Sequence, residues 1–323
     1  MAVTDMEIFN DFVMPRLHER LPQEVDKFNA ASGGSIILSV DSFTGNYLSQ
    51  SFYATLDATR RTVNRGAANG AASSTALAQN SAVTVKVAGG IGPVVFEPSQ
   101  LSFLSKPTQE GIDEVVTMFM EIIMKDQLNR ALLAATAAIE NNAAATNDVS
   151  GGATVTQRAI NGGLAKFGDR SQAIIALVMT GAQNHNLLDE AIQNSNSLYT
   201  IGGLAVMSGQ VAGQGRVIIV TDAPALTAVG KQKVLGLTRG AIVVNNTGDV
   251  ITNVETSNGK QRIETSVQVD YTFGLGVAGY SWDTALLTAG HTPTDAQLGT
   301  GANWGLNVSD VKSTAGVIIV GDE

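Results

Sequence analysis

The chain has 323 residues and a mass of 33.5 kDa, which is enough for two domains or one large, elaborate domain. Apolar residues make up 44% of it, which excludes wholesale disorder, whereas only 15% are charged, which indicates that partners cover much of the surface. A net charge of −9 disfavours a dedicated DNA-reading protein, and the absence of cysteine excludes disulfides, thiolate zinc sites and iron–sulfur clusters.

The N-terminal segment is predicted to be an arm. Residues 4–31 carry apolar side chains at helical spacing, but Pro15 and Pro22 interrupt the pattern. We therefore expect a jointed helical arm, followed by a short strand at residues 36–40.

A long hairpin is predicted next. Residues 47–62 form one extended limb, and in the other limb Val83, Val85 and Val87 alternate with Thr, Lys and Ala. The tip between the limbs, residues 66–82, consists mostly of Ala, Ser, Gly and Asn and cannot bury enough surface to fold on itself. Because an isolated two-stranded hairpin is marginally stable in water, this one is expected to lie on a partner surface.

The hairpin is also basic. Between residues 58 and 96 there are four cations, Arg60, Arg61, Arg65 and Lys86, and no acid, so the rest of the chain carries −9 − 4 = −13. We hypothesise that these four residues contact an acidic arm or spine surface of a neighbouring copy. A flexible, solvated loop explains the charge pattern equally well.

Residues 108–141 predict one long helix. Its apolar stripe comprises Ile112, Val115, Val116, Phe119, Ile122 and Ile123. At 1.5 Å per residue the helix is roughly 50 Å long and would act as a spine. Residues 143–154 are typical of a linker by composition.

A small α/β domain is expected after this linker. Helices are predicted at residues 156–167 and 182–193, and buried strands at residues 173–179 and 216–221.

The chain becomes rich in strands from Lys233 onward. The Asn-Gly pair at 258–259 signals a two-residue hairpin turn, and apolar residues alternate with polar ones after it. A further strand is expected at residues 275–282. Residues 284–323 are predicted to be a tail with one strand-like run at residues 317–320.

The sequence holds no recognisable catalytic, cofactor-binding or metal-binding constellation. Residues 274–279 (GLGVAG) spell a dinucleotide-binding fingerprint, but strand and turn residues follow where the mechanism needs a helix. His18, His185 and His291 have no partner at metal-ligand spacing. We therefore assign no catalytic residue, metal or cofactor and expect a protein that is not an enzyme. An acidic start and the lack of a long apolar run predict a soluble, intracellular chain without a membrane segment.

Seven stretches carry a resemblance to a known family. They are FNAASG (28–33), GNYLSQSF (45–52), KVAGGIGP (86–93), LNRALLAA (128–135), GRVIIVTD (215–222), GVAGYSW (276–282) and TAGVII (314–319). In this order and spacing, the chain resembles the major capsid (head) protein of tailed bacteriophages, with the Hong Kong 97 type fold.

The resemblance implies an α+β fold with an N-terminal arm, an extended β-hairpin loop, a long spine helix, a peripheral domain and an axial domain. The implied segments are the arm (1–44), the extended loop (45–107), the peripheral domain with its spine helix (108–150 and 255–285), the axial domain (151–254) and a C-terminal tail (286–323).

It further implies a structural protein that assembles with itself through hexamers and pentamers into an icosahedral head around double-stranded DNA. Assembly would take place in the host bacterial cytoplasm, with portal and decoration proteins as partners and no sequence-specific DNA binding. Because the arm starts at the first residues, a separate scaffold, or none, is expected. The type member cross-links a loop lysine, but Lys86 lies away from the tip, so a shell without cross-links is expected. Two alternatives stay open: a cellular encapsulating shell protein of the same fold, and a small α/β enzyme.

Overall fold

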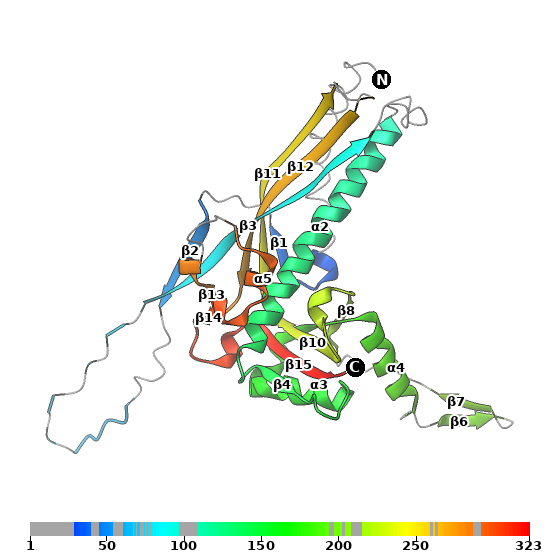
Figure 1. The fold of residues 1–323 in the computed structure, drawn as a ribbon. Coiled ribbons are helices and arrows are strands. Elements are labelled where there is room, and N and C mark those ends of the chain that lie inside the picture. The colour runs from blue at the N-terminus through cyan, green and yellow to red at the C-terminus, as the bar shows by residue number, and fades with distance from the viewer. Residues whose placement is uncertain are drawn as a thin grey trace.

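The computed structural model describes residues 29–39, 45–53, 61–66, 68, 70–71, 74, 76–77, 79–96, 109–193, 197–201, 204–207, 215–258, 261, 264–286 and 292–323. Two sheets and one long helix organise these residues into a mixed helix-and-sheet fold (Figure 1). Most of the predicted arm lies outside the described residues. The short strand expected after it is confirmed.

The first sheet has five strands in the order β1-β11-β12-β3-β2. They are β1 (Ile36–Ser39), β2 (Tyr47–Tyr53), β3 (Gln79–Phe96), β11 (Ile242–Ser257) and β12 (Glu264–Val277). β1 pairs with β11 in parallel, whereas the other neighbours pair antiparallel. Alternate residues face the core, among them Val85, Val87, Val269, Tyr271 and Phe273, which are all buried. The alternation predicted for both β3 and β12 is therefore confirmed.

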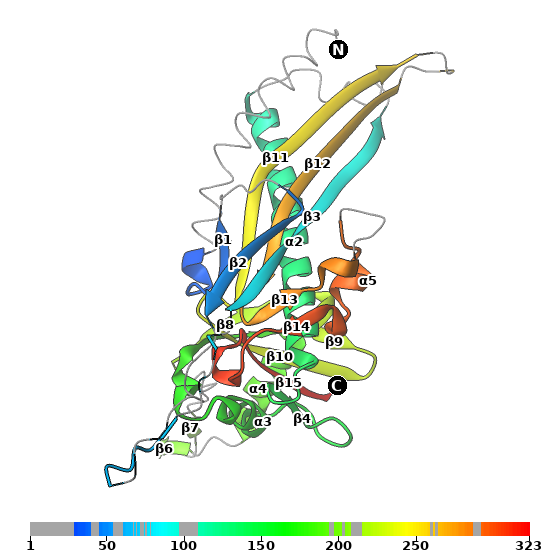
Figure 2. The same cartoon turned by 90° about the vertical axis from the view of Figure 1, so that its left-hand side faces the viewer.

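The helix α2 (Gln109–Glu140) confirms the predicted long helix and packs along one face of the five-stranded sheet (Figures 1 and 2). Its core face carries Met120, Ile123 and Leu132, followed by small alanines that allow close packing. The predicted apolar stripe is partly wrong. Ile122 is 45% exposed, because it lies about 100° around the helix from Ile123.

The second sheet runs in the order β4-β15-β10-β5-β8, with β9 added beside β10. Its strands are β4 (Thr146–Asp148), β5 (Ile174–Met179), β8 (Val217–Val220), β9 (Thr227–Ala228), β10 (Lys231–Thr238) and β15 (Gly316–Asp322). Leu235 and Ile318 on one face join the core under α2. Val234 and Ile319 on the other face share a second core with α3 (Gln157–Leu164) and α4 (Gly181–Gln193). This sheet is thus buried on both sides.

For this sheet one prediction is confirmed and two are corrected. The strand-like run predicted at residues 317–320 is β15, which lies inside the sheet, whereas the presumed linker contributes β4, which pairs in parallel with β15. Composition misled here because Gly and Thr also fit crowded strand positions. The strand expected to be buried at 216–221 is β8, an edge strand in which Val217 is 39% and Val220 is 51% exposed.

Shorter elements complete the described part of the fold. β12 ends at a turn, and β13 (Tyr280–Trp282) then pairs with β14 (Trp304–Leu306), so the predicted strand at 275–282 is divided in two. The fingerprint-like glycines are strand and turn residues, as predicted. β11 and β12 form the expected hairpin, but Ser257 pairs with Glu264, so residues 258–263 connect them where a two-residue turn was predicted. The other short elements are β6 (Ser197–Ile201), β7 (Leu204–Met207) and α5 (Asp295–Leu298).

Candidate assembly surfaces

The base of the β2–β3 hairpin is fastened to the body of the protein. The side-chain amide of Asn80 donates to the carbonyl of Asn307 at 3.0 Å, and the amide of Asn307 donates in return to the carbonyl of Ser81. The backbone N–H of Val83 donates to the hydroxyl of Ser281 at 3.1 Å. These bonds join β3 to the β13–β14 region and therefore fix the direction in which the hairpin leaves the sheet.

The tip of the hairpin is exposed throughout its described residues. Between β2 and β3 these residues form no helix or strand, and each of them is exposed to solvent. Val63 is 63% and Leu77 is 51% exposed, although both are apolar. In Figure 1 the described part of the tip stands away from both sheets. The tip thus presents apolar and small side chains that its own chain leaves uncovered.

The four basic residues singled out in the sequence fall into different settings. Arg61 and Arg65 are exposed in the tip, and Arg60 lies outside the described residues. Lys86 lies within β3, where it pairs with Gly274 of β12, and its backbone N–H donates to the carbonyl of Asn46 at 2.9 Å. The structure therefore places Arg61 and Arg65 in the exposed tip and Lys86 in the sheet. Their role in subunit contact stays a prediction.

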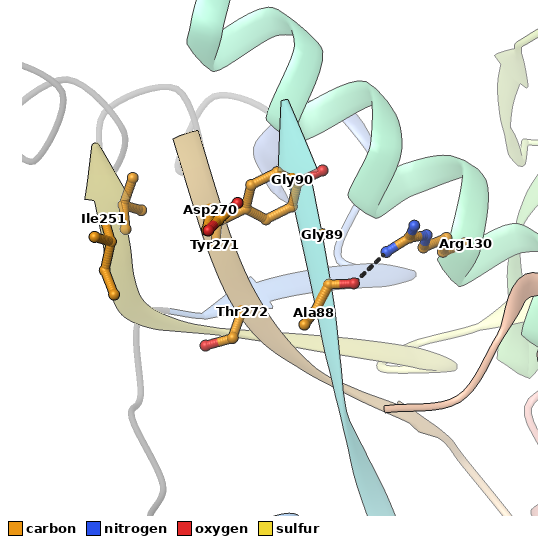
Figure 3. Close-up of a pocket in the computed structure, with 9 residues that line it drawn as sticks. Ala88, Gly89, Gly90, Arg130, Ile251, Asp270, Tyr271 and Thr272 are labelled. Carbon is orange, nitrogen blue, oxygen red and sulfur yellow. Dashed lines mark hydrogen bonds between the residues drawn. The ribbon is translucent and has the colours of Figure 1, made fainter. Parts of the chain in front are cut away.

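A groove of about 780 Å³ opens beside the middle of the five-stranded sheet (Figure 3). Its lining includes Gly89, Gly90, Arg130, Ile251, Asp270 and Tyr271. The ring of Tyr271 lies across Gly89, so a Cβ at that glycine would fall 2.5 Å from the ring carbon Cζ. Only glycine leaves room for the ring at this point of β3.

A polar cluster ties the spine to the sheet at this groove. The hydroxyl of Tyr271 donates to Asp126 at 2.5 Å, and Arg130 donates to the carbonyl of Ala88 at 2.9 Å. The Nε of Arg130 also lies 3.4 Å from Asp126 and 3.0 Å from Asp295. Burial, together with the hydrogen bond to Asp126, raises the pKa of Tyr271 well above its ordinary value. The cluster holds α2, β3, β12 and α5 in one arrangement.

Sequence reasoning missed this cluster. Its one local signal is the spacing of Asp126 and Arg130, four residues apart on one helix face. Tyr271 lies 145 residues away along the chain and was assigned only to a core face. The hydrogen bonds and ion pairs of the cluster join α2 to the five-stranded sheet.

The described residues were also compared with the requirements of a metal site and of a membrane-spanning helix. Within the described ranges, no three His, Cys, Asp or Glu side chains gather as a metal ion would require. His185 is exposed on α4, while His18 and His291 lie outside the described residues. None of the helices in the described part of the chain is long and apolar enough to cross a membrane.

Residues 5–318 match the family described as major capsid protein 13-like. The chain belongs to this family. Its role is therefore structural, in a phage capsid, as the resemblance in the sequence indicated. No curated protein matches the sequence.

Several solved structures share the fold. The chain resembles a structure from Mycobacterium phage Adephagia with 9% identity and a TM-score of 0.54, over 88% of each chain. For Mycobacterium phage Bobi the identity is 10% and the TM-score 0.53, over 88% of this chain and 89% of that one. The capsid asymmetric unit of cyanophage Pam1 aligns with 14% identity and a TM-score of 0.47, over 75% of this chain and 84% of that one. At these identities the likeness concerns the fold alone.

Proposed function

We propose that copies of this major capsid protein assemble through hexamers and pentamers into the icosahedral head of a tailed phage, around double-stranded DNA. The observation that carries the proposal is the β2–β3 hairpin. Its base is bonded to the body through Asn80, Ser81 and Val83, while the described tip residues are all exposed. A fixed base and an uncovered, partly apolar tip fit a loop that lies on a neighbouring subunit.

The proposal also covers the division into domains. The extended loop is residues 45–107, and α2 with β11 and β12, against which β3 of the loop pairs, forms the peripheral domain. The second sheet with α3 and α4 forms the axial domain. β11 runs unbroken from Ile242 to Ser257, which favours starting the second peripheral segment at Ile242 and not at residue 255. The position of β15 inside the second sheet favours joining the last residues to the axial domain.

Charge supports the same proposal. A chain with a net charge of −9 avoids non-specific adhesion to the DNA that it encloses. We include in the proposal a portal and decoration proteins as partners, and a separate scaffold or none. Assembly would occur in the host bacterial cytoplasm, and the shell would hold together without covalent cross-links.

The experiment reverses the basic tip. We expect the variant Arg60→Glu, Arg61→Glu, Arg65→Glu to fold as a subunit but to lose closed shells at low salt. Each exposed ion pair contributes only ~0.2–1 kcal/mol, but a shell repeats the contact in every subunit. Raised salt should restore part of the assembly, because it screens the new repulsion. Sizing chromatography and negative-stain microscopy measure the particles.

A matched control reverses three exposed cations elsewhere, Arg158, Lys166 and Arg170, so that the net charge changes equally. This control should assemble like the wild type. Normal assembly of the tip variant at low salt would contradict the role of the arginines. A wild-type protein that stays a small oligomer under all assembly conditions would contradict the shell proposal itself.

A further inference from the structure

The strand β8 combines a buried-type sequence with an exposed position. Its four residues, Val217 to Val220, are all β-branched and apolar, a run typical of a strand covered on both faces and both edges. In the structure β8 is the last strand of its sheet, with Val217 39% and Val220 51% exposed. It carries none of the charges or prolines with which proteins protect an open edge. The described residues thus leave an apolar edge partly exposed.

The backbone of β8 is also set for a further strand. β8 pairs with β5 in parallel, and the N–H of Thr221 donates to the carbonyl of Met179 at 3.0 Å. Because successive residues of a strand direct their amide groups to opposite sides, the N–H and C=O groups of Ile218 and Val220 point to the open side. A second strand placed there would receive both hydrogen bonds and apolar contact.

The same domain presents a segment that suits this edge. β6 and β7 form a two-stranded antiparallel hairpin, with Ile201 opposite Leu204, and among the described residues this sheet has no third strand. Residues 191–215 contain no charged side chain, and the hairpin strands read SLYTI and LAVM. Such a hairpin is marginal in water and needs a surface to lie on. Figures 1 and 2 show it beyond α4, away from β8 of its own chain.

We propose that the β6–β7 hairpin of one copy lies against the β8 edge of the next copy. The inference rests on the proposed shell function and names the contact that joins neighbouring axial domains. The two surfaces differ, so the contact is head-to-tail. Such contacts close into a ring when the rotation between neighbouring copies is a whole fraction of a full turn. A ring of six or five such contacts gives the hexamers and pentamers of the shell. A second copy is the occupant that the chain supplies, because the hairpin is uncharged and has no third strand among the described residues, while the β8 edge is apolar, uncharged and exposed at Val217 and Val220.

Cysteine cross-linking tests the contact directly, since the chain contains no cysteine of its own. One protein carries Val220→Cys in β8, and a second protein, with a tag of different size, carries Thr200→Cys in β6. The two are assembled together and treated with a short bismaleimide. We expect a mixed dimer of the two proteins on a denaturing gel. The double variant should give a ladder that ends at five and six subunits.

The matched control moves the cysteine to Val229, in the turn between β9 and β10, which is fully exposed at 104%. Val229→Cys mixed with Thr200→Cys should give no mixed dimer. Shells that assemble normally but give no mixed dimer through Val220→Cys would overturn the inference and leave the shell function intact. A double variant that cross-links only within one chain would overturn it as well. Failure of the wild type to form shells would instead count against the shell function.

A charge variant gives a second readout. Val220→Lys adds a charge at a half-exposed position, so we expect the subunit to keep the thermal midpoint of the wild type while the particle peak in sizing chromatography is lost. Val229→Lys should assemble like the wild type. A Val220→Lys protein that forms shells at wild-type yield would overturn the inference.

Discussion

Ile122 and Ile123 are neighbours in α2 with opposite surroundings, and replacing each by alanine tests how the spine packs. Ile123 is 0% exposed and belongs to the core shared by α2 and the five-stranded sheet. Ile122 is 45% exposed on the outer side of the helix. The residue type, the helix and the substitution are the same, so the difference between the two variants reports burial alone.

The expected magnitudes follow from the carbon atoms removed. Ile→Ala deletes three carbons, and at ~0.8 kcal/mol per buried CH₂ the lost transfer free energy at Ile123 is about 2.4 kcal/mol. The cavity left behind adds to this, so Ile123→Ala should lower the free energy of unfolding by about 3–4 kcal/mol. Ile122→Ala leaves no cavity, and alanine favours the helix by a few tenths of a kcal/mol. We therefore expect a cost below ~1 kcal/mol there.

Tryptophan fluorescence during denaturant unfolding is a suitable assay. The chain has two tryptophans, and Trp282 and Trp304 lie with ring centroids 5.0 Å apart in the same core as Ile123. The emission change therefore reports on the core under α2. Equal midpoint shifts for the two variants, or a larger one for Ile122→Ala, would refute the packing described above. If Ile123→Ala is insoluble, Ile123→Val gives the smaller loss of ~0.5–1.5 kcal/mol.

Two further predictions concern β15. Gly316 has a φ of 152°, and a Cβ at this position would lie 1.9 Å from the carbonyl oxygen of Gly236. Gly316→Ala should therefore abolish soluble, folded protein, whereas the control Gly305→Ala should not. Soluble yield and circular dichroism measure the difference. The carboxylate of Asp322 accepts N–H bonds from Gly151 at 3.0 Å and Gly152 at 2.6 Å, and the Gly151 bond above all lowers its pKa from 3.8. The pKa of Asp322 is lower in the folded protein than in the unfolded chain. The stabilisation by these hydrogen bonds is therefore complete above the unfolded-state pKa, and it is lost as the pH falls through the folded-state pKa. The midpoint difference between wild type and Asp322→Ala should therefore be present at pH 7 and vanish in strong acid; a difference that persists in strong acid would contradict the assignment.

Much of the fold could be predicted from the sequence where local periodicity decides the structure. The 3.6-residue period of the spine and the alternation in β3 and β12 each depend on a few neighbouring residues, and both predictions are confirmed. The predicted burial of Ile122 is wrong, because the sequence of a wide apolar stripe does not determine which edge of the stripe meets the sheet. That choice depends on strands more than a hundred residues away.

The groove cluster and the position of β15 inside the second sheet were missed for a related reason. Tyr271 reaches Asp126 only because β12 packs under α2, and no local sequence pattern predicts this contact. Gly316 and Gly236 meet through the close approach of β15 and β10, which makes glycine a packing requirement at that point. In the sequence Gly316 is among the residues whose composition favoured a loose tail. Composition describes a segment's flexibility in isolation, and the contacts of the fold override it.

The error at β8 has a different physical origin. An apolar run such as Val217 to Val220 is typical of a buried strand, yet in the single chain this strand lies at the edge of its sheet. Hydrophobic patterns record the surroundings in which a protein works, and a capsid protein works in an assembly. Since only 15% of the chain is charged, such surfaces are expected to be numerous. For β8 we therefore propose that another copy supplies the missing cover, and the uncharged β6–β7 hairpin is the segment of the same chain proposed to supply it.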